Sequence, residues 1–244
     1  MRAEEYERLA AVETRMWWFR GLHRNLVQVW RRAGLPSGSG KSRLLDAGCG
    51  TGGLLHRLAQ ADPAAIRIGL DRDPLACRFA GKVASVTQGS IDALPFADTA
   101  FDAIFSADVL CHRGVDGDAA LDELRRCLKP GGLLVLNLPA YQWLYSAHDR
   151  AVDNARRYGR CEVARMLESH GFTRIRATYW NTLLFPLMLL RRKLGSAEGA
   201  SEVTRLPAPL ERLFAALTRV ESWLIDKGLN LPFGGSILAS GVKS

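Results

Sequence analysis

A glycine-rich segment at residues 44–53, with the sequence LLDAGCGTGG, constrains the fold of this chain more than any other feature. Apolar residues lead into the segment and a helical pattern follows it, which predicts a strand, a tight turn and the start of a helix. Glycine permits backbone angles that other residues resist, and it lets a ligand approach the main chain closely. We therefore expect this turn to hold a ligand.

Short apolar runs alternate with helical patterns around the glycine-rich turn. We expect strands at residues 43–46, 66–71, 82–88, 101–106 and 133–138, and helices at 51–60, 74–81 and 119–128. Continuous apolar strands that alternate with helices predict a parallel sheet with both faces covered. The fold class expected from the sequence is therefore α/β.

The segments that flank this core have their own patterns. We expect a helix at residues 1–33, a flexible break at 34–40, a polar and aromatic loop at 141–160, a helix at 161–170, strands at 173–179 and 235–242, and a helical insertion at 181–233. In that insertion, Leu210, Leu213, Phe214, Leu217 and Leu224 recur at roughly helical spacing, which predicts a cap with an apolar underside. We expect a single domain over residues 1–244, with an N-terminal lid (1–40), a core (41–140) and a substrate-side part (141–244).

The composition is that of an ordinary soluble domain. Hydrophobic residues make up 48% and charged residues 24% of the 244 positions. The net charge of +8 is compatible with anionic partners such as nucleic acid, lipid headgroups or an acidic substrate, without choosing among them. The five cysteines are dispersed, with no C-x-x-C pair and no histidine at ligand spacing, so we expect reduced thiols and no metal site.

The hydropathy pattern predicts a cytoplasmic protein that is soluble or at most peripheral to a membrane. Residues 1–10 are charged and lack the apolar core of a signal peptide. The longest apolar run, residues 183–190, is interrupted by Pro186 and is far shorter than the roughly 20 residues that span a bilayer.

The ligand of the glycine-rich turn is indicated by its charged neighbour. Gly48, Gly50 and Gly53 also match the spacing of a dinucleotide fingerprint, which alone is a weak signal. Asp46 lies at the end of the strand, where a pyrophosphate would meet an unfavourable negative charge. A cationic ligand that carries an ammonium and a sulfonium group would be stabilised there.

Residues 45–52 (LDAGCGTG) closely resemble the first motif of the class I methyltransferases that use S-adenosylmethionine (SAM). The resemblance continues in order through residues 68–71 (IGLD), 89–96 (GSIDALPF), 101–112 (FDAIFSADVLCH) and 124–132 (LRRCLKPGG). It implies SAM as cofactor, S-adenosylhomocysteine as product, and a Rossmann-like, doubly wound sheet of seven strands. That sheet is mostly parallel, with one antiparallel strand in a C-terminal hairpin.

The resemblance also implies the residues that bind the cofactor. The acid at the end of the second strand, Asp71, binds the ribose hydroxyls, a role that suits a carboxylate because it accepts two hydrogen bonds. Ser90 stands where many relatives have the aspartate that holds the adenine amino group, so that contact falls to Ser90 or Asp92. The cofactor-binding residues expected in this way are Asp46, Gly48, Cys49, Gly50, Gly52, Asp71, Arg72, Ser90, Ile91, Asp92 and Ala107.

The methyl acceptor is expected beyond the carboxyl ends of the strands, where ligands of open α/β sheets bind. His112 follows the fourth strand and could be a general base near neutral pH. The alternative is a cap or packing residue at the start of the loop. Transfer from a sulfonium is an in-line displacement, and many such reactions need no base.

The loop at residues 141–158 resembles a subset of these methyltransferases that share S-x-H-D and R-R-Y elements. His148 and Asp149 could supply a base and an orienting carboxylate, and Arg156 or Arg157 could hold an anionic substrate. The alternative is a salt-bridged loop that ties the cap to the core. The substrate-binding residues expected here are Tyr141, Tyr145, Arg157 and Tyr158, together with Trp18 of the aromatic cluster at residues 17–19. That cluster is either a lid over the cofactor or a packed helix face.

The leading function predicted from the sequence is a methyltransferase that acts on oxygen or nitrogen of a small molecule. A lipid-linked acceptor, a protein or nucleic-acid acceptor, and a non-catalytic SAM-binding module are the alternatives. The apolar run at 183–190, followed by Arg191, could rest on an anionic membrane surface. No base-flipping motif follows the fourth strand and no RNA-binding module is visible, so no nucleic acid is expected as a partner. Asp46 disfavours a nicotinamide-dependent oxidoreductase.

Overall fold

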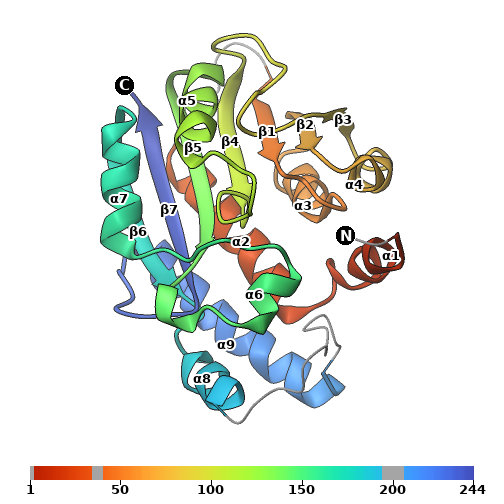
Figure 1. Ribbon diagram of the computed structural model, residues 1–244, viewed down its shortest axis with the longest axis vertical. Coiled ribbons are helices and arrows are strands. Elements are labelled where there is room, and N and C mark those ends of the chain that lie inside the picture. The colour runs from red at the N-terminus through yellow and green to blue at the C-terminus, as the bar shows by residue number, and fades with distance from the viewer. Residues whose placement is uncertain (1–2, 35–40, 194–205) are drawn as a thin grey trace.

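The structure is a computed structural model that describes residues 3–34, 41–193 and 206–244. One sheet of seven strands forms its centre, in the order β3-β2-β1-β4-β5-β7-β6 (Figure 1). The strands are β1 (Arg43–Ala47), β2 (Ile66–Asp71), β3 (Ser85–Gln88), β4 (Phe101–Ala107), β5 (Leu128–Pro139), β6 (Phe172–Trp180) and β7 (Ser236–Lys243).

The strand directions confirm the predicted sheet. Strands β1 to β5 pair in parallel, whereas β7 runs antiparallel to both of its neighbours, β5 and β6. The last strand thus inserts between β5 and β6, as the predicted C-terminal hairpin requires. Every strand expected from the sequence is present, although β5 begins five residues earlier than expected.

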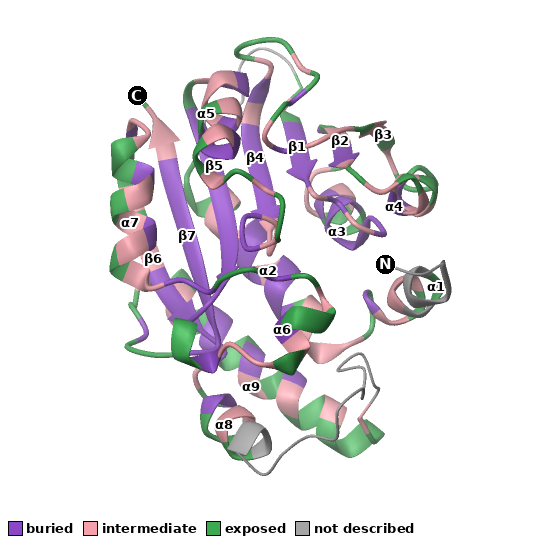
Figure 2. Ribbon diagram, viewed as in Figure 1, coloured by how far each residue is buried: buried purple, intermediate pink, exposed green. Residues whose placement is uncertain are grey.

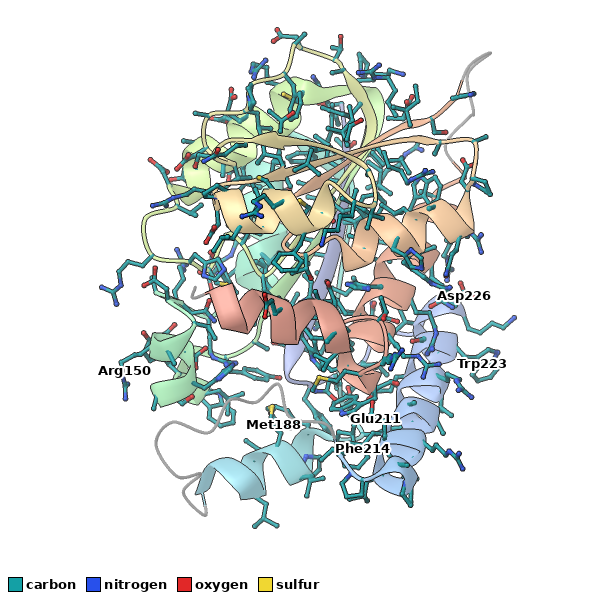
Figure 3. The ribbon with its side chains drawn as sticks, turned by 90° about the vertical axis from the view of Figure 1, so that its right-hand side faces the viewer. Arg150, Met188, Glu211, Phe214, Trp223 and Asp226 are labelled. Carbon is teal, nitrogen blue, oxygen red and sulfur yellow. The ribbon has the colours of Figure 1, made fainter. Side chains whose placement is uncertain are left out.

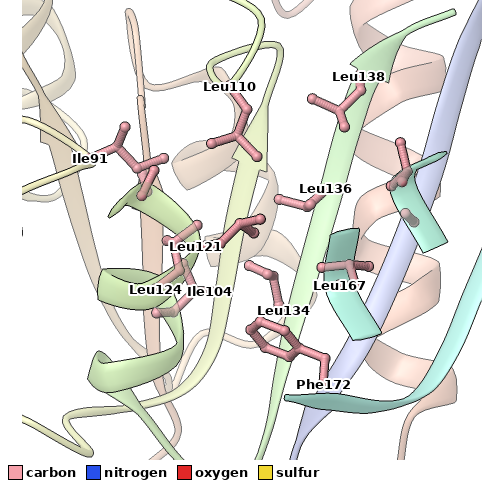
Figure 4. Packing of buried hydrophobic residues seen from close by; sticks show 14 of the residues in the cluster. Ile91, Ile104, Leu110, Leu121, Leu124, Leu134, Leu136, Leu138, Leu167 and Phe172 are labelled. Atoms are coloured by element: carbon pink, nitrogen blue, oxygen red, sulfur yellow. The ribbon is translucent and has the colours of Figure 1, made fainter. Parts of the chain in front are cut away.

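Helices cover both faces of the sheet. The helices of the core are α3 (Gly53–Ala61), α4 (Pro74–Ala80), α5 (Gly117–Cys127) and α7 (Arg160–Ser169). On one face, α5 and α7 place Leu121, Leu124 and Leu167 against Ile104 and Leu134 of the sheet (Figure 4). On the other face, α2 (Trp17–Arg32) and α3 complete a second cluster. The central strands are therefore buried along most of their length (Figure 2), which explains their continuous apolar sequences.

The N-terminal segment is not the single helix that the sequence predicts. It forms α1 (Ala3–Val12) and α2, separated by a turn at residues 13–16. The turn lies where the side chain of Glu13 reaches the glycine loop and bonds to Thr51 and Gly53. Of the predicted break at 34–40, residues 35–40 lie outside the described residues. The third strand is also shorter than predicted, because residues 81–84 complete a turn after α4.

The loop at 141–160 contains two short helices that the sequence did not reveal. These are η1 (Gln142–Leu144) and α6 (Ala147–Ala151), and α6 begins with a capping box in which Ser146 and Asp149 satisfy each other's backbone groups. Figure 1 shows α6 beside the carboxyl end of the sheet. The last two helices, α8 (Phe185–Lys193) and α9 (Ala208–Asp226), lie between β6 and β7 in the sequence.

The expectation of an apolar underside on the insertion is wrong for two of its leucines. Leu210 and Leu213 of α9 are exposed, at 43% and 51% of their surface, whereas the buried face consists of Ala215, Thr218, Glu221 and Ser222. Helix α9 packs closely on α2, where a Cβ added to Gly21 would lie 3.3 Å from Thr218 Cβ. Small side chains permit this approach. Val220 and Trp223 of α9 are also exposed, whereas Phe214 packs edge-on against Trp17 and Ile225 packs against the second cluster. Figure 3 shows Trp223 projecting outward from α9.

Within the described ranges, none of the helices combines the length and the apolar character needed to cross a lipid bilayer.

Candidate functional site

The glycine loop after β1 adopts the conformation that its sequence predicts. Gly48, Gly50 and Gly52 all have positive φ, at 91°, 50° and 91°. A Cβ added to Gly48 would lie 2.2 Å from Cγ2 of Val109, which follows β4. No other residue fits at this position, because both the backbone angle and the space exclude a side chain.

Asp46 lies at the end of β1, beneath the loop, and is only 2% exposed. Its Oδ2 atom is buried without a hydrogen-bond partner among the described residues. Burial, together with the charges of Glu13 and Asp71, raises the pKa of Asp46 well above its usual value. An unpaired buried carboxylate is costly, so this site fits a cationic ligand group and disfavours a pyrophosphate.

Asp71 lies at the end of β2, beside the same loop. Its Oδ2 accepts from the N–H of Gly50 at 2.8 Å, and its Oδ1 accepts from the N–H of Asp73 at 2.9 Å. A carboxylate has about four acceptor positions, so each oxygen retains capacity for a ligand hydroxyl. The backbone contacts hold the carboxylate still, as a residue that binds a ribose requires.

The residues predicted to hold the adenine lie after β3. The Ser90 hydroxyl bonds to Asp92, and this bond is the main reason that the pKa of Asp92 is lowered. Asp92 also accepts from the N–H of Asp116 at 3.3 Å. Ile91 is buried in the core and Arg72 is exposed. Because the side chains of Ser90 and Asp92 bond to each other, this pair favours neither residue as the contact for the adenine amino group.

Cys49 and Ala107 complete the predicted cofactor-binding set. The Cys49 thiol is buried against Leu55 and Ala80, and burial raises its pKa. Ala107 is half-buried at the end of β4. These two residues therefore shape the floor of the loop with apolar surface.

On the acceptor side, a hydrogen-bonded chain crosses the carboxyl ends of three strands. Trp180 Nε1 donates to Asn137 Oδ1 at 2.7 Å, and Asn137 Nδ2 donates to both carboxylate oxygens of Asp108 at 3.0 Å. The indole N–H can only donate, so it fixes the Asn137 amide with its NH₂ group toward Asp108. Sequence reasoning did not select any of these three residues.

Asp108 follows β4 directly and has a positive φ of 56°, which is uncommon for a residue with a side chain. Burial raises its pKa to about 7, although the Asn137 bond and the charge of Arg157 act in the opposite direction. A carboxyl group that titrates near neutral pH at the carboxyl edge of the sheet can exchange a proton with a ligand.

The substrate-side loop is held by a buried ion pair. Arg157 Nε lies 2.8 Å from Asp149 Oδ1, and their side chains are 6% and 0% exposed. Arg157 Nη1 also donates to the Ala140 carbonyl at 3.2 Å, and Asn154 Nδ2 donates to Asp149. Most of the donors and acceptors that the sequence suggested for a substrate are thus used within the loop.

The two tyrosines of this loop make similar internal contacts. Tyr158 is 2% exposed and donates its hydroxyl to the Leu110 carbonyl at 2.7 Å. The Tyr145 hydroxyl donates to the Asn154 carbonyl at 2.8 Å. The Tyr158 bond ties the loop to the segment after β4, whereas the Tyr145 bond joins two parts of the loop itself.

The remaining predicted residues surround this framework. His112 is half-buried and forms an isolated antiparallel bridge with Asn154, and His148 is half-buried in α6. Tyr141 stacks on Tyr179 with ring centroids 5.0 Å apart. The ring centroids of Trp18 and Trp180 lie 5.9 Å apart, so Trp18 contacts the first residue of the hydrogen-bonded series that leads to Asp108.

Some of the residues that were not predicted from the sequence had a recognisable sequence pattern, and others had none. Asn137 is the one polar residue in an otherwise apolar strand segment, residues 133–138, and Asp108 stands directly after a buried strand. Both positions could have been selected on those grounds. Glu13 and Glu221 gave no local signal, because their burial depends on contacts with residues distant in the sequence.

Glu13 and Asp108 make the stability of the unliganded protein depend on pH. Both carboxyl groups have a pKa of about 7 when folded, against 4.5 and 3.8 as ordinary values. The folded chain therefore binds more protons across this window, and these two groups lower its stability as the pH rises from about 4 to about 7. We expect the variant Glu13→Gln/Asp108→Asn to exceed the wild type in stability at pH 8 and to match it at pH 4.

Urea unfolding at the two pH values measures this difference. His23 acts in the opposite direction, because its pKa is lowered to about 3, but it is present in both proteins. A gain of equal size at pH 4 and pH 8 would show that these carboxyl groups titrate normally.

A surface hollow of about 300 Å³ lies elsewhere, between α7 and the edge strand β6. Its lining residues are Arg160, Cys161, Ala164, Ile175, Arg176, Ala177 and Asn230. It contains none of the residues predicted for the cofactor or the acceptor.

Comparisons with known proteins agree with this geometry. Residues 45–136 match the family of the methyltransferase domain. The chain is 36% identical over 145 residues to a ubiquinone/menaquinone biosynthesis C-methyltransferase of Cellvibrio japonicus, covering 53% of this chain and 56% of the relative. It is 36% identical over 103 residues to a malonyl-[acyl-carrier protein] O-methyltransferase of Dechloromonas aromatica, covering 42% and 38%. The chain thus spans 56% of the length of the first relative and 38% of the length of the second.

Solved structures confirm the fold over a greater length. A SAM-dependent methyltransferase of Thermotoga maritima superposes with a TM-score of 0.63 at 21% identity, over 99% of this chain and 95% of the other. Phosphoethanolamine N-methyltransferase 2 of Haemonchus contortus, in complex with SAM, gives a TM-score of 0.59 at 16% identity, over 90% and 52%. Residues 45–136 are thus similar to the methyltransferase domain, and the chain as a whole shares its fold with solved SAM-dependent methyltransferases.

Proposed function

We propose that the chain is an active methyltransferase that transfers the methyl group of SAM to oxygen or nitrogen of a small molecule. The observation that carries this proposal is the position of Asp108 directly after β4, where Asn137 Nδ2 donates to both of its carboxylate oxygens at 3.0 Å and burial raises its pKa to about 7. Methylation of a hydroxyl or amine releases a proton, which a group of this kind can accept.

On the cofactor side, Asp71 would bind the ribose hydroxyls and the glycine loop would approach the amino-acid end of the cofactor. SAM would supply an electrophilic methyl group that the acceptor attacks in line, with S-adenosylhomocysteine as the leaving group. The buried carboxylate of Asp46 favours the positive charge of such a ligand. These residues would bind and orient the cofactor, and the apolar side chains around the loop would limit the access of water.

We expect Asp108→Asn to lower kcat about 100-fold, while the affinity for SAM changes less than twofold. The variant keeps the shape of the side chain but cannot accept the proton. His112→Gln and His148→Gln, measured in parallel, test the two bases that the sequence suggested, and Asp149→Asn tests the carboxylate suggested to orient His148. A loss of kcat in His112→Gln or His148→Gln, with Asp108→Asn unaffected, would move the base to that histidine.

The acceptor that this site fits is partly apolar. Tyr141, Tyr179, Trp143, Phe185 and Phe233 form a cluster with ring centroids 5.0 to 6.4 Å apart, at the junction of η1 and α8. Aromatic rings provide a rigid surface for a planar or hydrocarbon group. A small molecule with one nucleophilic atom and an apolar body would use both this cluster and Asp108.

Methyl-labelled SAM tests the acceptor class. The protein is incubated with a host extract that is then separated into polar metabolites, lipids and macromolecules, and Asp71→Ala serves as the inactive control. Label in small molecules supports the proposal. Label in RNA or protein would overturn the acceptor class, and no transfer to any fraction would support a SAM-binding module without activity.

A lipid-linked acceptor at a membrane surface is the second candidate, because α8 and α9 expose large apolar side chains. Leu187, Leu190, Leu213, Val220 and Trp223 are each 49% to 56% exposed. Arg212 and Arg219 flank the α9 stripe and are exposed. Apolar groups beside cations suit an anionic bilayer surface.

Sedimentation with phosphatidylserine vesicles distinguishes this second candidate. Cosedimentation that is lost in Trp223→Ser, together with label in the lipid fraction, would support a membrane-bound acceptor. Absence of binding to both anionic and neutral vesicles would leave the stripe without a role in lipid contact.

A further inference from the structure

Glu13 was not assigned to the site from the sequence, yet its carboxylate lies against the glycine loop. Oε2 accepts from the Thr51 hydroxyl and from the N–H of Gly53 at 3.2 Å, at the N-terminus of α3. A Cβ added to Gly53 would overlap the Glu13 carboxyl group. Since Glu13 uses these helix donors, a second carboxylate cannot bind them at the same time.

The cluster around Glu13 contains acids and no positive partner. His23 Nε2, 3.7 Å from Glu13 Oε1, is the one basic group within 4 Å in the described part of the chain. Burial and the charge of Arg57 lower the pKa of His23 to about 3, so its imidazole is neutral. Glu13 also lies near enough to Asp46 to raise the pKa of that carboxyl group.

Two buried carboxylates thus converge on one loop, and Asp46 Oδ2 has no partner there. Buried charges in proteins are paired, because an isolated one is strongly destabilising. The missing partner is therefore a cation that arrives with the ligand. SAM carries two positive groups, an α-ammonium and a sulfonium, of which only the ammonium donates hydrogen bonds.

We propose that Glu13, together with Asp46, binds the α-ammonium group of SAM. Glu13 occupies the N–H of Gly53 and the Thr51 hydroxyl, so the amino-acid end of the cofactor binds with its ammonium toward Glu13 and its carboxylate away from these two donors. Glu13 is contributed by the turn between α1 and α2, so cofactor binding also depends on the N-terminal segment.

Calorimetric titration of Glu13→Gln with three ligands tests this assignment. SAM has the ammonium, the carboxylate and the sulfonium, decarboxylated SAM lacks only the carboxylate, and 5′-methylthioadenosine lacks all three groups. S-adenosylhomocysteine, which lacks only the sulfonium, is titrated in parallel and should be weakened as SAM is, because it keeps the ammonium. We expect Glu13→Gln to weaken SAM and decarboxylated SAM about tenfold, because a charged hydrogen bond is lost, and to leave methylthioadenosine within twofold of the wild type. Glu7→Gln, an exposed acid on α1, is the matched control.

Other outcomes would overturn the proposal in distinguishable ways. Equal weakening of all three ligands indicates a structural role for Glu13, and unchanged binding of all three removes it from the site. Tighter binding of SAM alone indicates that Glu13 competes with the cofactor carboxylate. Failure of the wild type to bind SAM would contradict the cofactor assignment itself. Thermal unfolding verifies that Glu13→Gln folds. If that variant does not fold, Glu13→Asp, which keeps the charge, is titrated in its place.

Discussion

Arg157→Met is expected to lower the free energy of unfolding by about 3–5 kcal/mol, the range observed when one partner of a buried ion pair is removed. Arg157 is the charged partner of Asp149, whose side chain has no exposure to solvent. Methionine replaces the apolar part of the side chain but leaves the carboxylate buried and without its cation. Urea denaturation at pH 8 measures the loss.

Two comparisons make this prediction specific to the ion pair. Arg156→Met removes the neighbouring arginine, whose pair with Glu162 is 52% and 40% exposed, and should cost at most about 1 kcal/mol. Burial raises the pKa of Asp149, but the charge and hydrogen bond of Arg157 outweigh it and hold the pKa below its usual value. Without Arg157 the carboxyl group will protonate more readily, so the penalty should shrink as the pH falls. A penalty of the same size at pH 4 and pH 8 would assign the loss to packing instead.

Asp71→Ala is expected to weaken SAM binding about 1,000-fold, as the loss of two charge-assisted hydrogen bonds at roughly 2 kcal/mol each implies. The substitution removes the acceptor for the ribose hydroxyls and also releases the N–H of Gly50, so the glycine loop loses a fixed point. Calorimetry with SAM and with S-adenosylhomocysteine measures the effect, which should be similar for both ligands because both carry the ribose.

Asp122→Ala, at an exposed position on α5, is the matched control for this measurement. It removes an aspartate of similar charge without contact to the loop, and its affinity should equal that of the wild type. Unchanged affinity in Asp71→Ala would refute the ribose assignment.

The core of the fold could be predicted from the sequence because its signals are local. The strands β1, β2 and β4 are short apolar runs bounded by helices or turns, and the glycine loop requires positive φ at fixed positions. These features act over a few residues, so they can be read without knowledge of distant contacts. The sheet order itself was implied by the resemblance to a known family.

The insertion and the acceptor side could not be predicted in the same way. The apolar residues of α9 suggested a buried underside, but at Gly21 of α2 the two helices approach so closely that the small side chain of Thr218 faces the glycine. Glu221 is buried there because it accepts from the N–H groups of Asn181 and Leu183. Contacts of this kind join residues about 40 or about 200 positions apart, and no local pattern encodes them.

The insertion of β7 between β5 and β6 determines the order in which the strands of this domain can pair during synthesis. Strand β6 pairs only with β7 in the described sheet, so it has no neighbouring strand until residues 236–243 have left the ribosome. Until then, α8 and α9 have been translated but the strand that precedes them is not joined to the rest of the sheet. The nascent chain therefore passes through a stage with an exposed strand edge, and chaperone binding during translation should be greatest at this stage.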